Sequence, residues 1–247
     1  MYYKEILRVG KSFVPFVGTL AAIALLCIAI PNSSISLGAN VHPQIPIVFF
    51  FIIAGISAAI LATIIGTSLA AENDDHLEVV WTLPASRLAY ALRVMAVDVL
   101  GIILLFAFAV LAGLAIIYAH GFGRYLVFDQ DSGGQLLRFL AYPLAWFGVS
   151  QALTASLRSK APLYAGLAWP VAIVLLLLYE APLTTPLHMI LKVMNLINPL
   201  VYGSYASGTS VTAELLTLNA LVAAGALLAL WLAGSGVALA EWRRLQA

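Results

Sequence analysis

Uncharged apolar runs alternate with short polar connections along the whole chain. Six runs are close to or above the roughly 20 apolar residues that a helix needs to cross the hydrocarbon core of a bilayer. The third run holds Arg93 and Asp98 near its start, so its buried part is expected to begin later. The pattern predicts six transmembrane helices, at Phe13–Ile30, Ile47–Ala71, Ala89–Ala119, Leu136–Leu157, Leu163–Tyr179 and Leu215–Ala240.

Composition agrees with this pattern and excludes several classes of protein. The 247 residues are 63% hydrophobic and 9% charged, and mean hydropathy is +1.02, whereas soluble chains carry about 25% charged residues. The 12 basic and 11 acidic side chains nearly cancel, so no broad basic surface exists for nucleic acid. The single Cys27 excludes an intrachain disulfide framework and a cysteine-based metal site. We predict one all-α, polytopic domain over residues 1–247 in the lipid bilayer, with no nucleic-acid partner.

Basic residues predict how the spans are oriented, because cytoplasmic connections are enriched in Lys and Arg. With both termini on the inner side, the outer connections hold only Arg124, Arg138 and Lys192 of the 12 basic residues. This bias predicts a multi-pass protein whose termini both face the cytoplasm. Residues 1–12 are basic and amphipathic, and they are expected to form either an interfacial helix or a plain basic flank of the first span.

Catalytic and nucleotide-binding motifs are scarce. Gly10-Lys11-Ser12 resembles the end of a phosphate-binding loop, but Glu5 stands where that loop needs its first glycine. The four histidines are scattered over separate connections, and neither His-Glu-x-x-His nor Gly-x-Ser-x-Gly occurs. We predict no catalytic residue, no metal site and no ATPase site in this chain.

Two carboxylates come close to the interior of the spans, where ionisable groups are costly. Asp98 is expected to pair with Arg93 or Arg87 near the cytoplasmic end, and Glu180 to be solvated at the outer end of the fifth span. An intramembrane enzyme would place ionisable pairs at mid-membrane, and the sequence offers none. That alternative is therefore the weakest.

The connection between the second and third spans, residues 72–86, carries the most informative pattern. As a helix it places Leu77, Val80 and Trp81 on one face and acidic residues on another. Such a helix could dock a soluble partner or lie on the membrane surface, and the pattern leaves both open. The candidate docking residues are Glu72, Asp74, Leu77, Glu78, Val80, Trp81, Pro84 and Arg87.

The outer connection before the last span, residues 181–213, is apolar between Pro186 and Val201 but too short and polar to cross a membrane. An apolar helix at membrane depth that does not span must be buried in protein. From its residues alone this segment could equally be a helix that lies on the outer membrane surface.

The acidic residues, then Leu77-Glu78, and then Leu83-Pro84-Ala85-Ser86-Arg87 before a new span resemble a connection in permeases of the ABC type-2 exporter family. That connection reads as acidic residues, Gly-Thr-Leu-Glu, apolar residues and Pro-x-Ser-Arg. This chain differs at Asp75-His76, where the family often has Gly-Thr. The resemblance covers most of the chain as architecture, but only residues 72–87 as a motif.

This resemblance implies the permease subunit of an ATP-binding-cassette exporter in the cytoplasmic membrane of a bacterium, working by alternating access. A second copy or a homologous permease would complete the path. ATP and Mg²⁺ would be bound by two copies of a separate ATPase subunit. This chain itself would bind neither of these cofactors. Residues 72–86 would be the coupling helix that contacts the ATPase.

The resemblance also implies two short re-entrant helices in residues 181–213, with a break at Asn198 and Pro199. The path is expected to be lined by the first, second and fifth spans, including Ser57, Thr63 and Tyr164. Short outer loops favour a hydrophobic or amphipathic cargo. The alternative from another class is a membrane anchor or assembly subunit that docks a soluble partner without transporting anything.

Overall fold

The computed structural model describes residues 3–29, 44–75, 87–157, 160–180, 185–203 and 219–244. Two short strands, β1 (Ile45–Pro46) and β2 (Leu126–Val127), pair in parallel, and a 3-10 turn, η2 (Phe122–Tyr125), precedes β2. The other described elements are α-helices: α1 (Tyr3–Ala29), α2 (Val48–Ile65), α3 (Ser68–Asp75), α5 (Arg87–Ala119), α6 (Ser132–Thr154), α7 (Ala161–Glu180), α8 (Thr185–Leu196), α9 (Pro199–Gly203) and α11 (Ala220–Arg244).

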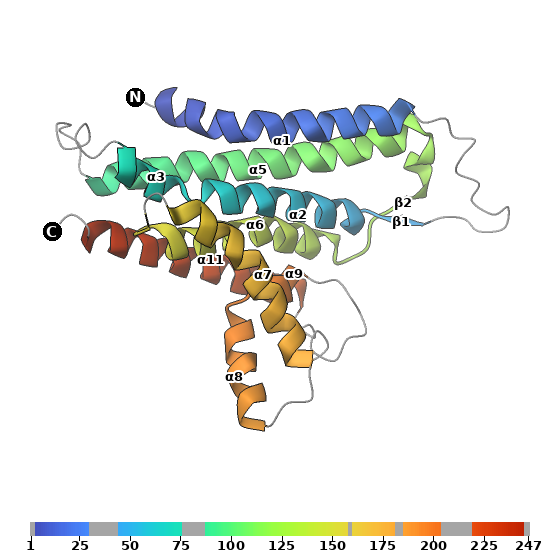
Figure 1. Cartoon of the computed structure of the whole chain (residues 1–247). Helices are drawn as coiled ribbons and strands as arrows, with labels where there is room; N and C mark the ends of the chain where they lie inside the picture. Colours follow the sequence, from blue (N-terminus) through green and yellow to red (C-terminus); the bar gives the residue numbers. More distant parts are fainter. Residues whose placement is uncertain are drawn as a thin grey trace.

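The long helices lie side by side in an elongated bundle (Figure 1). The start of α1, the end of α11 and helix α3 lie at one end of this bundle, which we call the terminal end. The strands β1 and β2 and the turn η2 lie at the opposite end. Helices α7 and α8 pack against each other and project from the side of the bundle.

Among the described residues, five helices are long and apolar enough to cross a membrane, at Ile6–Ala29, Val48–Ala71, Leu88–Ala119, Ala161–Tyr179 and Ala220–Arg244. They coincide with five of the six predicted spans, and the prediction of an all-α chain embedded in a membrane is confirmed. The remaining predicted span forms α6, which is not in this set because polar side chains such as Arg138 and Gln151 dilute its apolar sequence.

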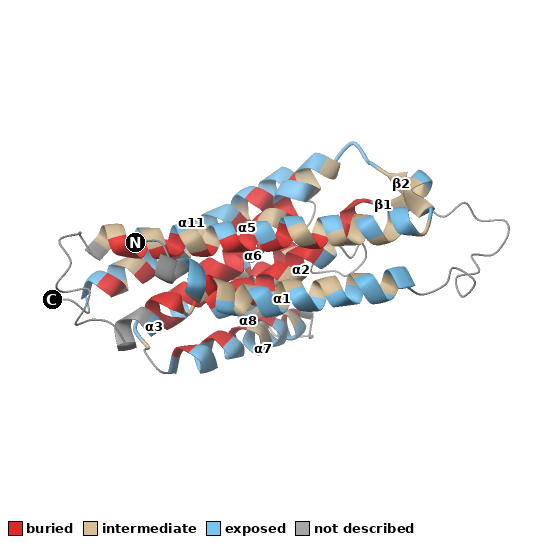
Figure 2. Cartoon of the chain, turned by 90° about the horizontal axis from the view of Figure 1, so that it is seen from above, coloured by how far each residue is buried: buried red, intermediate tan, exposed pale blue. Residues whose placement is uncertain are grey.

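Helix α6 is the buried centre of the bundle, packed between α2 and α11 (Figure 2). Phe139, Trp146 and Phe147 are almost fully buried, and so are the polar side chains of Ser150 and Gln151. A helix enclosed by other helices does not need an apolar surface, because its neighbours rather than lipid contact its polar groups. The burial of α6 therefore explains why it is less apolar than the helices around it.

Two glycines allow α6 and α11 to cross closely. A Cβ atom on Gly148 of α6 would lie 2.7 Å from the backbone oxygen and 2.8 Å from the Cα atom of Trp231 in α11. A Cβ atom on Gly234 of α11 would in turn clash with the backbone of Gly148. The two backbones touch here, and only glycine at both positions permits that contact.

The N-terminal interfacial helix predicted for residues 1–12 does not form a separate element. Residues 3–12 continue into the first apolar run, so that α1 is a single helix of 27 residues, with Pro15 inside it. Val9 is buried, and its side chain lies against Gly101 of α5. Packing of these first turns on α5 keeps them in line with the span instead of letting them turn away from it.

Candidate functional site

Polar side chains of the bundle gather in clusters at different depths. The basal cluster, towards the terminal end, consists of Arg8 of α1, Ser68 of α3 and Asp98 of α5. Arg8 Nη2 donates to Asp98 Oδ1 at 2.7 Å, and Ser68 Oγ donates to Asp98 Oδ2 at 2.6 Å. Asp98 is fully buried, whereas 23% of the Arg8 side chain is exposed. The cluster joins α3, which leads into the predicted coupling segment, to α1 and α5.

Sequence reasoning predicted a partner for Asp98 but did not name Arg8. The expected partners were basic residues at the start of the same helix, whereas Arg8 and Asp98 are separated by 90 positions. Arg8 belongs to the basic start of the chain, which was interpreted as facing the membrane surface. No signal in the sequence points to Ser68.

The central cluster holds α2, α6 and α7 together. Trp169 Nε1 donates to Thr63 Oγ1 at 2.9 Å, and Ser150 Oγ donates to the Thr63 backbone oxygen at 2.7 Å. The Trp169 ring stacks on Trp146 with centroids 4.1 Å apart and planes within 4°. Thr63 Oγ1 donates to the Ala59 carbonyl at 2.9 Å. The Thr63 hydroxyl thus accepts a hydrogen bond from α7, while its proton is donated within α2.

The outer cluster surrounds the junction of α8 and α9. Asn198 is placed before Pro199 at the start of α9, and its Oδ1 accepts from the Leu200 backbone amide at 3.1 Å, as a helix-capping side chain does. Asn198 Nδ2 donates to the Ala172 carbonyl of α7 at 2.9 Å. Asn195 Nδ2 donates to the Leu175 carbonyl, also of α7, at 3.1 Å. Two asparagines therefore fasten the junction to α7.

A buried arginine fastens α9 to the centre of the bundle. Arg138 Nε of α6 donates to the Tyr202 carbonyl at 2.6 Å, and the Tyr202 hydroxyl donates to the Leu196 carbonyl at 3.0 Å. Arg138 is 5% exposed. It was one of the three basic residues expected in outer connections, but it lies inside α6. Only Arg124 and Lys192 therefore remain as basic residues expected on the outer side.

The break predicted at Asn198 and Pro199 is where α8 ends and α9 begins. The three predicted path residues lie in different surroundings. Ser57 lines a groove of about 320 Å³ between α1 and α2. Thr63 is buried in the central cluster, and Tyr164 lies on the outer surface of α7, 45% exposed.

The predicted coupling segment is described only at its ends. Glu72 and Asp74 belong to α3, and Arg87 is the first residue of α5. The other docking candidates, Leu77, Glu78, Val80, Trp81 and Pro84, lie outside the described residues. In the part of the chain that the structure describes, no three His, Cys, Asp or Glu residues are grouped so that they could hold a metal ion.

Comparison of the chain with protein-family models, with curated proteins and with solved structures gave no match. A functional interpretation therefore depends on the residues and geometry of this chain itself.

Proposed function

We propose that this chain is the membrane-spanning subunit of an ATP-driven exporter, paired with a second such chain and with two separate ATP-binding subunits. The observation that carries the proposal is the sequence of residues 72–87, which resembles the ATPase-contacting connection of exporter permeases. The end of α3 and the start of α5, which bound this segment, lie at the terminal end of the bundle (Figure 1). A soluble ATPase on that side of the membrane could reach it.

The basal cluster supports a coupling role for this segment. Asp98 binds Ser68 of α3 and Arg8 of α1, so a displacement of α3 would break the hydrogen bond from Ser68 to this charged carboxylate. A hydrogen bond to a charged group contributes about 1.5–3 kcal/mol. Motion imposed on the segment by an ATPase would therefore pass to α1 and α5 as a unit.

In this proposal α6 also crosses the membrane, which brings the number of spans to six. Its 23 residues correspond to a helix of about 35 Å, long enough to cross a hydrocarbon core of about 30 Å. Its polar groups are accommodated because α2 and α11 shield them from lipid.

Helices α8 and α9 are the outer re-entrant helices of the proposal. Met189, Ile190 and Val193 of α8 are exposed, whereas Asn195 is fully buried and His188 stacks on Tyr179 of α7, with centroids 4.3 Å apart. This helix has its apolar side outward and its polar side inward, the reverse of a helix in water. Such an arrangement suits surroundings of lipid or protein at membrane depth.

Ser57 is the candidate that we keep for the transport path. It lies in the groove between α1 and α2, with Thr19 of α1 in the other wall, and a second chain placed against this face would close the groove. Thr63 serves to hold α2 to α7 in this interpretation. The cargo is hydrophobic or amphipathic, because the groove is apolar apart from those two hydroxyls.

Purification of the tagged chain from its native membranes tests the proposal. Mass spectrometry should find a protein with a phosphate-binding loop in equal copy number, and its ATP hydrolysis should respond to an amphipathic cargo. A stable partner without nucleotide-binding residues would contradict the proposal and would favour a membrane anchor instead.

A further inference from the structure

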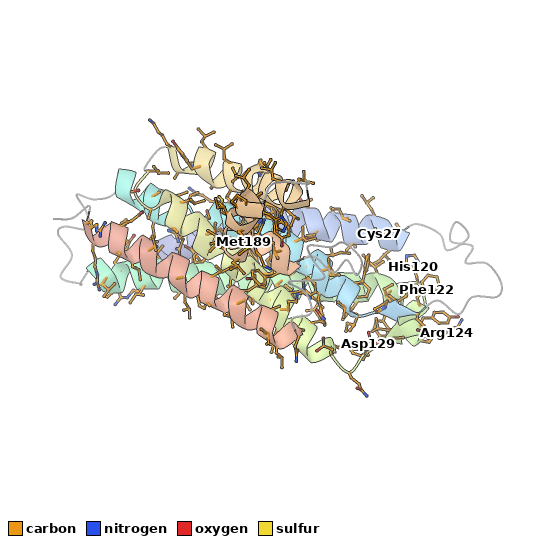
Figure 3. All side chains as sticks on the ribbon, turned by 90° about the horizontal axis from the view of Figure 1, so that it is seen from below. Cys27, His120, Phe122, Arg124, Asp129 and Met189 are labelled. Carbon is orange, nitrogen blue, oxygen red and sulfur yellow. The ribbon has the colours of Figure 1, made fainter. Side chains whose placement is uncertain are left out.

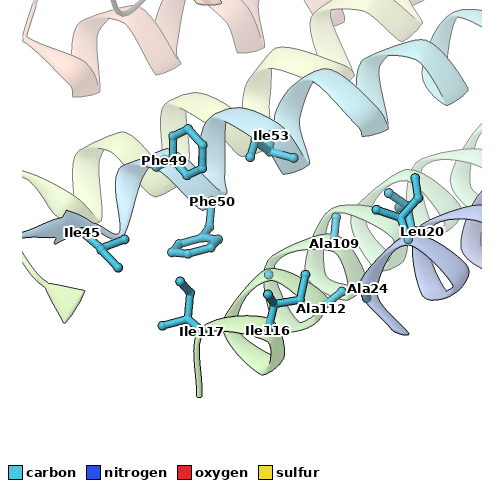
Figure 4. A pocket seen from close by; sticks show the side chains of 12 residues that line it. Leu20, Ala24, Ile45, Phe49, Phe50, Ile53, Ala109, Ala112, Ile116 and Ile117 are labelled. Atoms are coloured by element: carbon cyan, nitrogen blue, oxygen red, sulfur yellow. The ribbon is translucent and has the colours of Figure 1, made fainter. Parts of the chain in front are cut away.

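A cavity of about 450 Å³ lies between α1, α2 and α5, near the end of the bundle that carries β1 and β2 (Figure 4). We call it the outer cavity. Its 12 lining residues are all apolar, and they include Leu20 of α1, Phe49 and Phe50 of α2 and Ile116 of α5. This volume is in the range of small-molecule binding sites, about 300–1,000 Å³.

The position of the outer cavity determines which solvent can reach it. Its three walls belong to helices that are each long and apolar enough to cross a membrane. Water in the cavity would find no polar partners, and apolar cavities stay dry for that reason. At membrane depth the molecules that can fill the cavity are the hydrocarbon chains of lipids.

The dimensions of the cavity suit one straight chain from one leaflet. Along α5 its lining runs from Ala109 to Ile117, a rise of about 12 Å at 1.5 Å per residue. That length is a little under half of a hydrocarbon core of about 30 Å.

Small residues create the space. Ala24 of α1 and Ala109, Ala112 and Gly113 of α5 line the cavity opposite the rings of α2. A Cβ atom on Gly113 would already meet Phe50 Cδ1 at 2.5 Å. Larger side chains at these positions would fill the cavity, so its emptiness depends on this group of small residues.

A basic side chain, Arg124, lies at the same end of the bundle as the outer cavity (Figure 3). Ile45, in the cavity wall, pairs with Leu126 of β2, two residues after Arg124. Arg124 is exposed, and its guanidinium lies over the Tyr125 ring at 4.7 Å. Arg124, His120 and Cys27 lie at the same end of the bundle (Figure 3), and His120 Nε2 donates to the Cys27 carbonyl at 2.9 Å, which ties α5 to α1 there. A guanidinium at this position is suited to a phosphate.

We propose that the outer cavity binds one acyl chain of a membrane phospholipid, with the phosphate of that lipid at Arg124. The site is contained within a single chain, so it requires neither an ATPase nor a second permease. It can therefore be present or absent whether or not the chain is an exporter subunit.

Photo-crosslinking of the full-length chain in phosphatidylcholine nanodiscs tests this site. The probe is phosphatidylglycerol with a diazirine in its palmitoyl chain, and mass spectrometry maps the labelled residues. Labelling should concentrate on the cavity walls of α2 and α5, and excess unlabelled phosphatidylglycerol should suppress it. Ala112→Phe should lower that labelling by more than about tenfold, because excluding two methylenes from the cavity costs about that much affinity.

Ala115→Phe is the matched control, since Ala115 is exposed on the same helix and does not line the cavity. Its labelling should equal that of the unchanged chain. If Ala112→Phe fails to elute as a single species, Ala24→Phe closes the cavity from α1 instead, with the exposed Ala22→Phe as its control.

Three results would overturn the proposal. Labelling spread evenly over the exposed helix faces would indicate bulk lipid only. Unchanged wall labelling in a folded cavity-filling variant would place the lipid elsewhere. Equal labelling of the walls by a free palmitic acid probe and by the phospholipid, with no effect of Arg124→Ala on either, would exclude a phosphate contact.

Discussion

Gly148 and Gly234 set the distance between α6 and α11. A methyl group on Gly148 would press on the backbone of Trp231 at 2.7–2.8 Å, and backbone cannot move aside as a side chain can. Gly148→Ala should therefore destabilise the chain by about 1–3 kcal/mol, as overpacking does. The midpoint of thermal unfolding in detergent measures this loss.

Gly225 of the same pair of helices supplies the control. Nothing lies within 4 Å of a Cβ atom placed there, so Gly225→Ala should leave stability unchanged or raise it by about 0.5–1 kcal/mol through helix propensity. Equal effects of the two substitutions would show that α6 and α11 do not touch at Gly148.

The basal cluster makes a second prediction at the residue scale. Arg8→Leu leaves the fully buried Asp98 carboxylate without its guanidinium, and it should cost about 2 kcal/mol. This is less than the 3–5 kcal/mol of a fully buried pair, because Arg8 is partly exposed. The double variant Arg8→Leu with Asp98→Leu should be more stable than Arg8→Leu alone, since it removes both charges of the pair. Thermal unfolding of both variants checks the order, and losses that simply add would contradict it.

The need of Asp98 for a partner could be predicted from the sequence, but the identity of that partner could not. A carboxylate inside an apolar run requires compensation wherever it lies. Which cation approaches it depends on how α1 packs against α5, and Gly101 and Val9 determine that contact. The Gly148–Gly234 contact escaped the sequence analysis for the same reason, because the two residues belong to different helices.

At the scale of elements, apolar runs located the helices well because length and hydrophobicity dictate a membrane span. The apolar run at 136–157 predicts a span like the others. Its polar residues do not by themselves indicate that this helix lies at the centre of the bundle. The resemblance implied a break at Asn198 and Pro199, and α9 begins at Pro199 because an N-cap and a first-turn proline act locally. Residues 3–12 continue into α1 because they pack against α5, and this tertiary contact could not be predicted from the sequence.

The segment between α3 and α5 carries the prediction that matters most for coupling. Leu77, Val80 and Trp81 are the residues predicted to form an apolar face that docks on the ATPase, and a large aromatic anchor contributes about 2 kcal/mol or more to such an interface. Trp81→Ala with Leu77→Asp should therefore weaken ATPase binding at least about thirtyfold. Binding of the purified ATPase to the chain in nanodiscs gives this ratio.

The acidic face of the same segment provides the control pair. Asp75→Ala with Glu78→Ala should have a smaller effect, since exposed charges contribute little each. Insertion of both double variants into the membrane should be normal, because the changes lie outside the predicted spans. An apolar-face variant that binds and couples like the unchanged chain would show that this segment is not the coupling helix.

At the scale of the whole molecule, helix direction and charge agree. Lys11 near the start of α1, Lys160 at the start of α7, and Arg243 and Arg244 in the last turn of α11 belong to connections predicted to be cytoplasmic. The starts of α1 and α5 and the end of α11 lie together at the terminal end (Figure 1). One side of the membrane therefore receives most of the basic residues, and we expect that side to be the cytoplasm.

Thiol labelling of intact cells tests this orientation. In a Cys27→Ser background, Ser33→Cys should react with an impermeant reagent from outside, and Ser159→Cys should react only after the cells are opened. The two positions are in connections at opposite ends of the predicted spans. Reaction of position 159 alone in intact cells would reverse the topology.

The ATP hydrolysis of the chain, measured alone and then with its co-purifying ATPase, tests the central claim most directly. The chain has no phosphate-binding loop, so a preparation free of other proteins should neither bind nor hydrolyse ATP. Adding the ATPase should restore hydrolysis to the membrane complex, and an amphipathic cargo should stimulate it only when this chain is present. Hydrolysis by the isolated chain, or an ATPase whose activity is indifferent to the chain and to cargo, would contradict the assignment as an exporter permease.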